Sequence, residues 1–247
     1  MRFRATVAYV GTFFHGWQVQ ENAARTVQAV LEEELDAFSG GPVRVHASGR
    51  TDAGVHADGQ VVHFDAPDRP PEGLVAWVNR RLPWDVRLLD ATEAAPDFHA
   101  RSDARAKRYV YRFSRERVIP PSRVLFVAPL SPRADPAAMA QAAARIEGSH
   151  DFHPFSTAGT ETETTRRTVF ACRIEEEGPE ISISLTADGF LRGMARAIAG
   201  TIAEIGRGRF PPSRIDEIFD KSDKSLVADK AKPRGLTLRE VFYGKPD

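Results

Sequence analysis

One short segment of the chain combines residue types that could carry out chemistry, SGRTDAGVHA at residues 48–57. Gly49 and Gly54 flank an arginine and an aspartate, and glycine tolerates the positive φ angles that tight loops need. We therefore expect Asp52 at the crown of a loop, two residues after Arg50. A carboxylate in that position suits a turn residue, a metal ligand or a nucleophile.

Metal binding is the first of these roles to consider. Four side chains with oxygen or nitrogen donors fall within twelve residues, namely Asp52, His56, Asp58 and His63. His63 lies in a predicted strand, GQVVHFD, whose alternation puts it on one face with Val61 and Asp65. Nothing in the spacing brings Asp52 and His56 to one point. The pattern therefore argues against a metal site.

An enzyme that acts on a flipped RNA base fits the segment better. It needs a carboxylate on a preformed loop, a base-stacking aromatic residue and cations, one to keep the carboxylate ionised and others for phosphates. Tyr109 or Tyr111, in the strand RYVYRF, supplies the aromatic ring, since alternation puts both on one face and Arg108 on the other. The same alternation is more typical of two core tyrosines, so both roles stay open.

Basic residues gather in one part of a chain whose net charge is zero, with 34 basic and 34 acidic side chains. The acids between residues 101 and 123 are only Asp103 and Glu116. The basic residues of that stretch are Arg101, Arg105, Lys107, Arg108, Arg112, Arg115, Arg117 and Arg123. Arginine suits phosphate recognition through its planar, forked guanidinium, so this basic cluster favours an RNA-binding surface.

The first half of the chain shows alternating strand and helix patterns in the order βαββαβ. The expected elements are a strand at 2–10, a helix from Val27 ended by Gly40, strands at 43–47 and 59–65, a helix at 73–81 and a strand at 86–89.

The second half repeats this order. The expected elements are a strand at 106–114, a helix with Asp135 as N-cap, Pro136 at its first position and an end at Gly148, strands at 167–176 and 180–187, a helix at 190–205, a short helix and a strand at 236–243. Residues 222–235 are expected to form a surface loop. The repetition predicts an α+β fold of two pseudo-symmetric subdomains, at residues 1–100 and 101–247, with mainly antiparallel sheets, flanking helices and a site in the cleft between them.

The helix expected at 190–205 has one apolar face and one face with arginines. Arg192 and Arg196 lie opposite the apolar stripe, where their neighbours are Ala199, Gly200 and Ala203. Small residues around an arginine indicate that another element approaches closely. We therefore expect Arg196 to reach into the cleft.

Composition excludes several classes of protein. Hydrophobic residues make up 42% and charged residues 28%, and no run of eighteen apolar residues could span a membrane. The first residues, MRFRATVAYVG, lack the pattern of a secretory signal, so we expect a cytoplasmic protein. Its only cysteine, Cys172, excludes an internal disulfide and a cysteine cluster, and its apolar neighbours predict a buried, unreactive thiol.

The segment at residues 49–64, GRTDAGVHADGQVVHF, resembles the catalytic signature of the TruA family of tRNA pseudouridine synthases. The resemblance extends over nearly the whole chain. Further motifs match in order, namely GWQVQ (16–20), RTVQAVLEEEL (25–35), NRRLPWDV (79–86), DFHAR (97–101), KRYVY (107–111), FLRGMARAIAGTIAEIG (190–206) and the last strand at 235–243.

The resemblance implies a role for individual residues. It makes Asp52 the catalytic nucleophile, Tyr109 the ring that stacks on the target uracil, and Arg196 the cation that keeps Asp52 ionised. Arg50 would displace the flipped nucleotide. The remaining substrate-binding residues that we expect are Arg108 and Arg192.

The resemblance also implies the reaction, the fold and the partners. The reaction is isomerisation of uridine to pseudouridine at positions 38, 39 and 40 of the tRNA anticodon arm. The fold is the pseudouridine synthase fold, with a central basic cleft. The family uses neither metal nor cofactor, and its members act as homodimers in which one tRNA touches both subunits.

Two other classes of function stay open. A catalytically silent tRNA-binding protein would keep the basic cluster without needing Asp52. A metal-dependent hydrolase would lose activity on chelation. A glycoside hydrolase needs a second carboxylate, and the resemblance puts the nearest one, Asp58, in a variable loop where we expect it to be solvated.

Overall fold

The computed structural model describes residues 1–20, 25–66, 73–157 and 162–246. The chain folds as two compact units. Unit 1 comprises residues 1–105 and 238–245, and unit 2 comprises residues 106–237. The chain therefore returns to its first unit at the end, through the last strand.

Unit 1 has the predicted order βαββαβ. Its elements are β1 (Arg2–Tyr9), the short 3-10 turn η1 (Gly11–Phe13), α1 (Val27–Ser39), β2 (His46–Ala47), β3 (His56–Asp65), α2 (Leu74–Arg81) and β4 (Val86–Glu93). The strand order is β4-β1-β3-β10, and β2 also pairs with β3. The strand expected at 43–47 is wrong in length, because only its last two residues pair with β3.

Unit 2 contains a longer series of elements. They are β5 (Ala106–Ser114), β6 (Ala128–Pro129), α3 (Pro136–Ile146), β7 (Gly148–Asp151), η2 (His153–Phe155), β8 (Arg166–Glu177), β9 (Glu180–Ala187), α4 (Met194–Gly206), α5 (Arg214–Lys221), η3 (Lys224–Leu226) and η4 (Pro233–Gly235), followed by β10 (Leu236–Phe242), most of which belongs to unit 1. The strand order is β5-β9-β8-β7.

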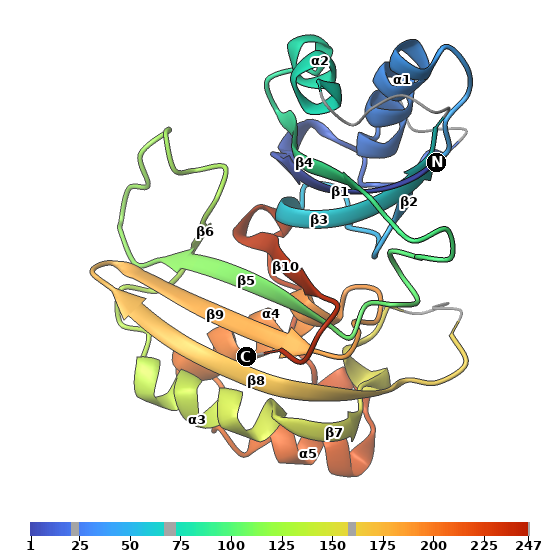
Figure 1. The fold of residues 1–247 in the computed structure, drawn as a ribbon. Coiled ribbons are helices and arrows are strands. Elements are labelled where there is room, and N and C mark those ends of the chain that lie inside the picture. Colours follow the sequence, from blue (N-terminus) through green and yellow to red (C-terminus); the bar gives the residue numbers. More distant parts are fainter. Residues whose placement is uncertain (21–24, 67–72, 158–161, 247) are drawn as a thin grey trace. The chain divides into compact units, whose positions relative to one another are not determined.

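Pairing within each unit is mainly antiparallel, as predicted, with β5 and β6 as a parallel pair. In each unit the helices lie along the sheet, α1 and α2 in unit 1 and α3, α4 and α5 in unit 2 (Figure 1). The fold is therefore a mixed α+β fold. Within the described ranges, no helix is long and apolar enough to cross a membrane.

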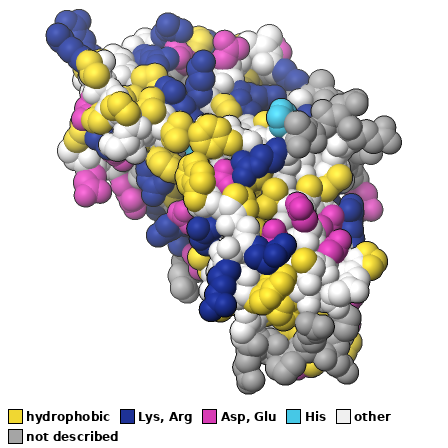
Figure 2. All heavy atoms as spheres, turned by 90° about the horizontal axis from the view of Figure 1, so that it is seen from above, with side chains coloured by type: hydrophobic (Ala, Val, Ile, Leu, Met, Phe, Trp, Pro, Cys, Tyr) yellow, Lys and Arg dark blue, Asp and Glu magenta, His cyan; other side chains and the backbone are white. Residues whose placement is uncertain are grey.

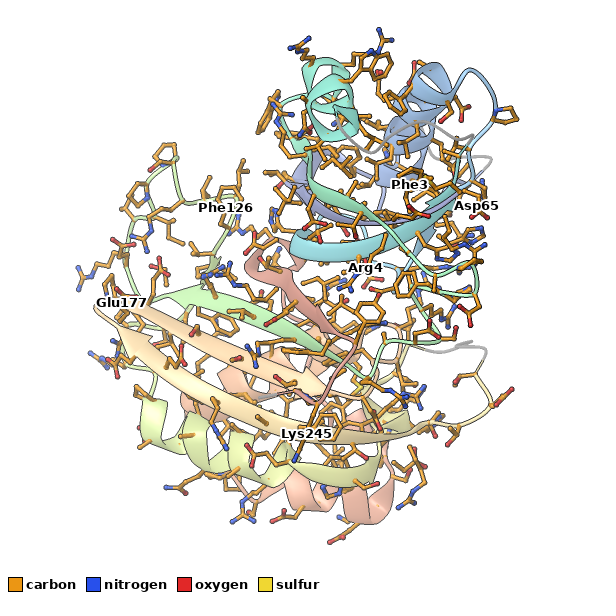
Figure 3. The ribbon with its side chains drawn as sticks, in the orientation of Figure 1. Phe3, Arg4, Asp65, Phe126, Glu177 and Lys245 are labelled. Atoms are coloured by element: carbon orange, nitrogen blue, oxygen red, sulfur yellow. The ribbon has the colours of Figure 1, made fainter. Side chains whose placement is uncertain are left out.

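The alternation of β1 builds the core of unit 1. Phe3 faces the helices and stacks on Phe64 of β3, with ring centroids 5.4 Å apart, whereas Arg4 faces the other way and lies over the ring of Tyr243 (Figure 3). Tyr9 lies on the same face as Phe3 and is also buried. The strand thus carries a buried tyrosine at its C-terminal end.

The helix ends agree with the sequence except at two points. Asp135 caps α3, since its side chain accepts a hydrogen bond from the backbone of Ala137. However, α3 ends at Ile146, and Gly148, which we expected to close the helix, begins β7 instead. The helix expected from residue 190 begins only at Met194, because Gly193 adopts a φ of 76° that interrupts the helical backbone.

The surface combines apolar and cationic side chains. The face of the molecule that carries α1 and α2 shows exposed hydrophobic side chains bordered by lysine and arginine (Figure 2). Among the exposed hydrophobic residues Val118, Trp84, Leu89 and Phe13 each keep more than half of their surface open. Cys172, by contrast, is buried as predicted, and burial raises the pKa of its thiol to about 12.

Candidate active site

The loop that carries Asp52 is fastened to β3 at its start. The buried hydroxyl of Ser48 donates to the side-chain oxygen of Gln60 at 2.7 Å. The amide nitrogen of Gln60 donates in turn to the carbonyl of Gly49, also at 2.7 Å. The backbone of Ser48 also bonds to Val61 at 2.8 Å. One buried glutamine therefore fixes the entry to the loop.

A tight turn then carries Asp52 itself. The backbone N–H of Val55 donates to the carbonyl of Asp52 at 3.1 Å, and Gly54 has a φ of 78°. Gly54 therefore has the backbone conformation that tight loops need and glycine tolerates. Gly49 does not have a positive φ. Asp52 is half-buried and Ala53 after it is exposed, so the residue lies in an accessible turn, as expected.

Two glycines of a neighbouring segment form the seat of this loop. A Cβ on Gly11 would lie 1.9 Å from the carbonyl oxygen of Val55, so only glycine fits there. A Cβ on Gly16, which has a φ of 90°, would lie 2.9 Å from the carbonyl oxygen of Thr51. Trp17 donates its backbone N–H to that same oxygen at 3.1 Å. The backbone on both sides of Asp52 is thus held by close packing.

A buried tyrosine holds the residue before Asp52. The hydroxyls of Tyr9 and Thr51 share a hydrogen bond of 2.8 Å, and both residues are buried. Burial raises the pKa of Tyr9 to about 12, so its hydroxyl stays protonated near neutral pH. The pattern of the sequence did not indicate the role of Tyr9, Gln60 or the two glycines Gly11 and Gly16. The glycines at the two ends of GTFFHG were the available signal.

The residues considered as metal ligands are engaged in separate interactions. His56 accepts the backbone N–H of Gly11 at Nδ1, and His63 accepts that of Ala100 at Nδ1. Asp58 lies in β3, where it is exposed and forms an ion pair with Arg239 at 2.6 Å. The expectation that Asp58 is solvated is therefore confirmed, whereas its expected place in a loop is wrong, because it lies in β3. Within the part of the chain that the structure describes, no group of three ligands could hold a metal ion.

Unit 2 contains the two candidate tyrosines. Tyr109 and Tyr111 share the buried face of β5, with Arg108 on the other face, as the alternation predicts. The ring of Tyr109 meets that of Phe190 edge to face, with centroids 4.8 Å apart. The hydroxyl of Tyr111 donates to the carbonyl of Lys232 at 2.7 Å. Both tyrosines line a small hollow against α4, and burial raises the pKa of Tyr111 well above its usual value.

The arginine face of α4 contacts another element, as its small residues predict. Arg196 donates from Nε to the carbonyl of Ala231 at 2.8 Å, and the backbone N–H of Ala231 donates to the carbonyl of Arg196 at 3.0 Å. A Cβ on Gly200 would lie 2.1 Å from the carbonyl oxygen of Asp229. Residues 228–231 therefore pack along α4 and fix the stem of Arg196.

Arg192 occupies a different position from the predicted one. It precedes α4, in the turn that ends at Gly193, and its side chain is exposed. Its carbonyl accepts the backbone N–H of Thr157 at 2.8 Å. Arg108 is half-buried and donates from Nε to Thr186 at 3.2 Å.

The basic cluster of residues 101–123 is partly neutralised. Arg123 pairs with Glu116 at 2.9 Å and also with Glu180, and Arg115 pairs with Glu176. Glu176 and Glu180 come from β8 and β9, so the count of acids along residues 101–123 could not include them. The net positive charge of this cluster is therefore smaller than the count along residues 101–123 indicated.

The candidate residues thus divide between the two units. Asp52 and the exposed Arg50 belong to unit 1, whereas Tyr109, Arg108, Arg192 and Arg196 belong to unit 2. Within unit 1, Asp52 stands on a loop that Tyr9 and Gln60 hold in place. Within unit 2, Tyr109 and Arg196 stand on β5 and α4, two elements that line one hollow.

Comparisons with known proteins agree with this arrangement of motifs. A family model described as tRNA pseudouridine synthase matches residues 5–103 and 142–244 of the chain. The tRNA pseudouridine synthase A of Nitratidesulfovibrio vulgaris is 39% identical, over 98% of this chain and 96% of its own length. The proteins of the same name from Myxococcus xanthus and Exiguobacterium sibiricum are each 40% identical, over 98% of this chain and 92% and 96% of their own lengths.

Proposed function

Because the chain belongs to the tRNA pseudouridine synthase family, we propose that it isomerises uridine to pseudouridine at positions 38, 39 and 40 of the tRNA anticodon stem-loop. The observation that carries this proposal is the seat of the loop at residues 48–57. Gly11, Gly16, Tyr9 and Gln60 hold its backbone, so the backbone that bears Asp52 is preorganised before any substrate binds.

The reaction rearranges bonds without a change in mass. The bond between N1 of the base and C1′ of the ribose breaks, and a bond between C5 and C1′ forms after the uracil has rotated. C5 then loses its proton to solvent, and N1 gains one. Asp52 acts as the nucleophile, through either the sugar or the base. Both routes require an extruded nucleotide, which Arg50 at the exposed end of the loop helps to displace.

The residues of unit 2 hold the detached base and the RNA backbone. Tyr109 stacks on the uracil while it rotates, and Arg196 keeps Asp52 ionised. Packing of Ala231 and Asp229 against α4 supports this role, because it fixes the Arg196 stem. Arg108 and the exposed Arg192 contact the RNA.

The proposed enzyme also has the finer features of the family fold. Asp52, Tyr109 and Arg196 act on one nucleotide in a basic cleft flanked by two pseudo-symmetric subdomains, residues 1–100 and 101–247. The enzyme acts in the cytoplasm as a homodimer, in which one tRNA touches both subunits, and needs neither metal nor cofactor.

Tritium release from tRNA that carries 5-tritiated uridine tests the reaction, since only chemistry at C5 liberates the label. The buffer contains a chelator, so that a metal-dependent hydrolase would be inactive. We expect release by the wild-type chain and none by Asp52→Ala. The matched control is Asp58→Ala, which removes a nearby exposed carboxylate that is paired with Arg239.

Each outcome separates the candidate functions. Release by the wild type and by Asp58→Ala, but not by Asp52→Ala, supports the synthase and the nucleophile. Substantial release by Asp52→Ala refutes the assignment of Asp52 as the nucleophile. Intact tRNA binding without release by the wild type would favour a silent tRNA-binding protein.

A further inference from the structure

Two aromatic side chains of unit 1 are exposed next to each other. Phe13 keeps 52% and Trp84 66% of its surface open, and their ring centroids lie 6.1 Å apart at an angle of 70°. The neighbouring Phe14, by contrast, is 3% exposed and lies beneath the guanidinium of Arg25. Burial therefore explains Phe14, whereas Phe13 and Trp84 contribute little to the core.

The aromatic pair is tied to the loop that carries Asp52. Phe13 ends the short turn η1, which begins at Gly11, and Gly11 packs directly against the carbonyl of Val55. On the other side, Asp85 follows Trp84, and its backbone carbonyl accepts the backbone N–H of Val10 at 2.9 Å. One segment is thus anchored on the loop at Val55 and the other on Val10, directly after β1, so both are held relative to the backbone of the loop that carries Asp52.

The carboxylate next to Trp84 does not oppose an anionic ligand, because its charge is compensated. Asp85, next to Trp84, is buried. Both of its carboxylate oxygens accept hydrogen bonds from Arg25 at 2.8 Å, so the arginine compensates its negative charge. Arg80 and Arg81 at the end of α2 are exposed, and Arg81 pairs with Glu34. Arg50 on the loop is exposed as well.

We propose that Phe13 and Trp84 form a stacking surface for an unpaired nucleotide of the RNA beside the target uridine, an inference that rests on the proposed function. Bases in single-stranded loops stack on exposed aromatic side chains, and this contact tolerates any base. In an edge-to-face pair, the ring that contributes its edge keeps its own faces open to such a base. The pair thus holds the RNA loop while the uridine is extruded.

A second copy of the chain is the main competing occupant. A stable protein interface buries about 800 Å² on each partner. A single aromatic side chain, by contrast, can bury only about 150 to 250 Å². Two partly exposed rings therefore fall well short of an interface on their own, but they match the area of one or two bases.

The test measures binding of an anticodon stem-loop RNA in an Asp52→Asn background, which prevents turnover. We expect Trp84→Ala to weaken binding roughly 5- to 150-fold, the effect of losing one stacked base. Trp84→Phe should restore most of the affinity because it keeps an aromatic face. Leu89→Ala is the matched control, since it removes a 53% exposed apolar side chain from the same unit.

Tryptophan fluorescence gives an independent readout. Trp17 is 3% exposed and Trp77 is half-buried, so stacking on RNA should quench mainly the emission of Trp84. RNA should therefore quench the Asp52→Asn protein strongly and its Trp84→Phe variant weakly. Equal quenching in both proteins would contradict the proposal.

The two proposals fail in different ways. If the wild type releases tritium but Trp84→Ala binds RNA normally, the stacking surface is refuted and the synthase stands. If the wild type releases no tritium but binding depends on Trp84, the reaction is refuted and the stacking surface stands. If Trp84→Ala changes the sedimentation of the protein without changing RNA affinity, the surface joins two copies of the chain and the proposal is wrong.

Discussion

The hydroxyl of Tyr9, at the end of β1, lies 2.8 Å from the hydroxyl of Thr51, the residue before Asp52. A buried hydrogen bond thus connects the central strand of unit 1 to the crown of the loop. Because both residues are buried, removing one hydroxyl leaves the other without a hydrogen-bond partner. This contact joins the stability of unit 1 to the geometry of the candidate nucleophile.

Replacing Tyr9 by phenylalanine should lower both stability and turnover. The free energy of unfolding should fall by about 1 to 2 kcal/mol, because the hydroxyl of Thr51 remains buried without its partner. Turnover in the tritium assay should fall several-fold, since Thr51 no longer fixes the start of the turn. Tyr243→Phe is the matched control. It removes a tyrosine hydrogen bond to Ala100 in the same unit and should cost similar stability without the loss of turnover. Equal turnover in the two variants would contradict a positioning role for Tyr9.

Replacing Gly11 by alanine should disturb the loop more strongly. The new Cβ would lie 1.9 Å from the carbonyl oxygen of Val55, so the backbone after Asp52 must move. A displacement near 1 Å can lower turnover by roughly 100-fold, and overpacking costs about 1 to 3 kcal/mol of stability. Gly41→Ala is the control, because its Cβ would meet nothing within 4 Å. Thermal unfolding and tritium release measure the two effects. A fully active Gly11→Ala enzyme would show that the packing of Gly11 against Val55 does not position the loop.

Local patterns predicted most elements because they depend on near neighbours in the chain. The alternation in RYVYRF gave the buried face of β5, and Asp135 followed by Pro136 gave the start of α3. The seat of the loop could not be predicted in this way. Gly11 meets Val55 across 44 positions of sequence, and the paired charges of Arg123 and Glu180 are similarly distant. Such contacts depend on tertiary packing, which periodicity does not encode.

Replacing Gly200 by alanine should affect Arg196 without touching it. The new Cβ would lie 2.1 Å from the carbonyl oxygen of Asp229, which must push residues 228–231 away from α4. The hydrogen bond from Arg196 to Ala231 would then be strained or lost. We expect turnover to fall roughly 10- to 100-fold, with tRNA affinity nearly unchanged. Gly244→Ala, whose Cβ meets nothing within 4 Å, is the control. Normal turnover by Gly200→Ala would show that this packing does not position Arg196.

The histidines of unit 1 should make its stability depend on pH. His63 is 3% exposed, stacks on His46 with centroids 4.8 Å apart, and lies 4.6 Å from the ring of His99. Burial, followed by the charges of His99 and His46, lowers the pKa of His63 to about 4. Its Nδ1 atom also accepts the N–H of Ala100, which a proton on that nitrogen would prevent.

The sign of the pH effect follows from proton binding. Between pH 6.5 and 4 the unfolded chain binds a proton at His63 that the folded chain does not, so acid favours unfolding. The stabilisation is complete above pH 6.5 and falls by up to about 3 kcal/mol as the pH approaches 4. Urea unfolding at a series of pH values measures this slope.

Two variants identify the residue responsible. His63→Asn keeps an oxygen that can accept from Ala100 and does not titrate, so the slope between pH 5 and 6.5 should become shallower. His15→Asn removes an exposed histidine and should leave the slope unchanged. Carboxylates with lowered pKa values, such as Asp65 beside Arg2, contribute only at more acidic pH. An unchanged slope in His63→Asn would therefore show that the acid sensitivity arises elsewhere than at His63.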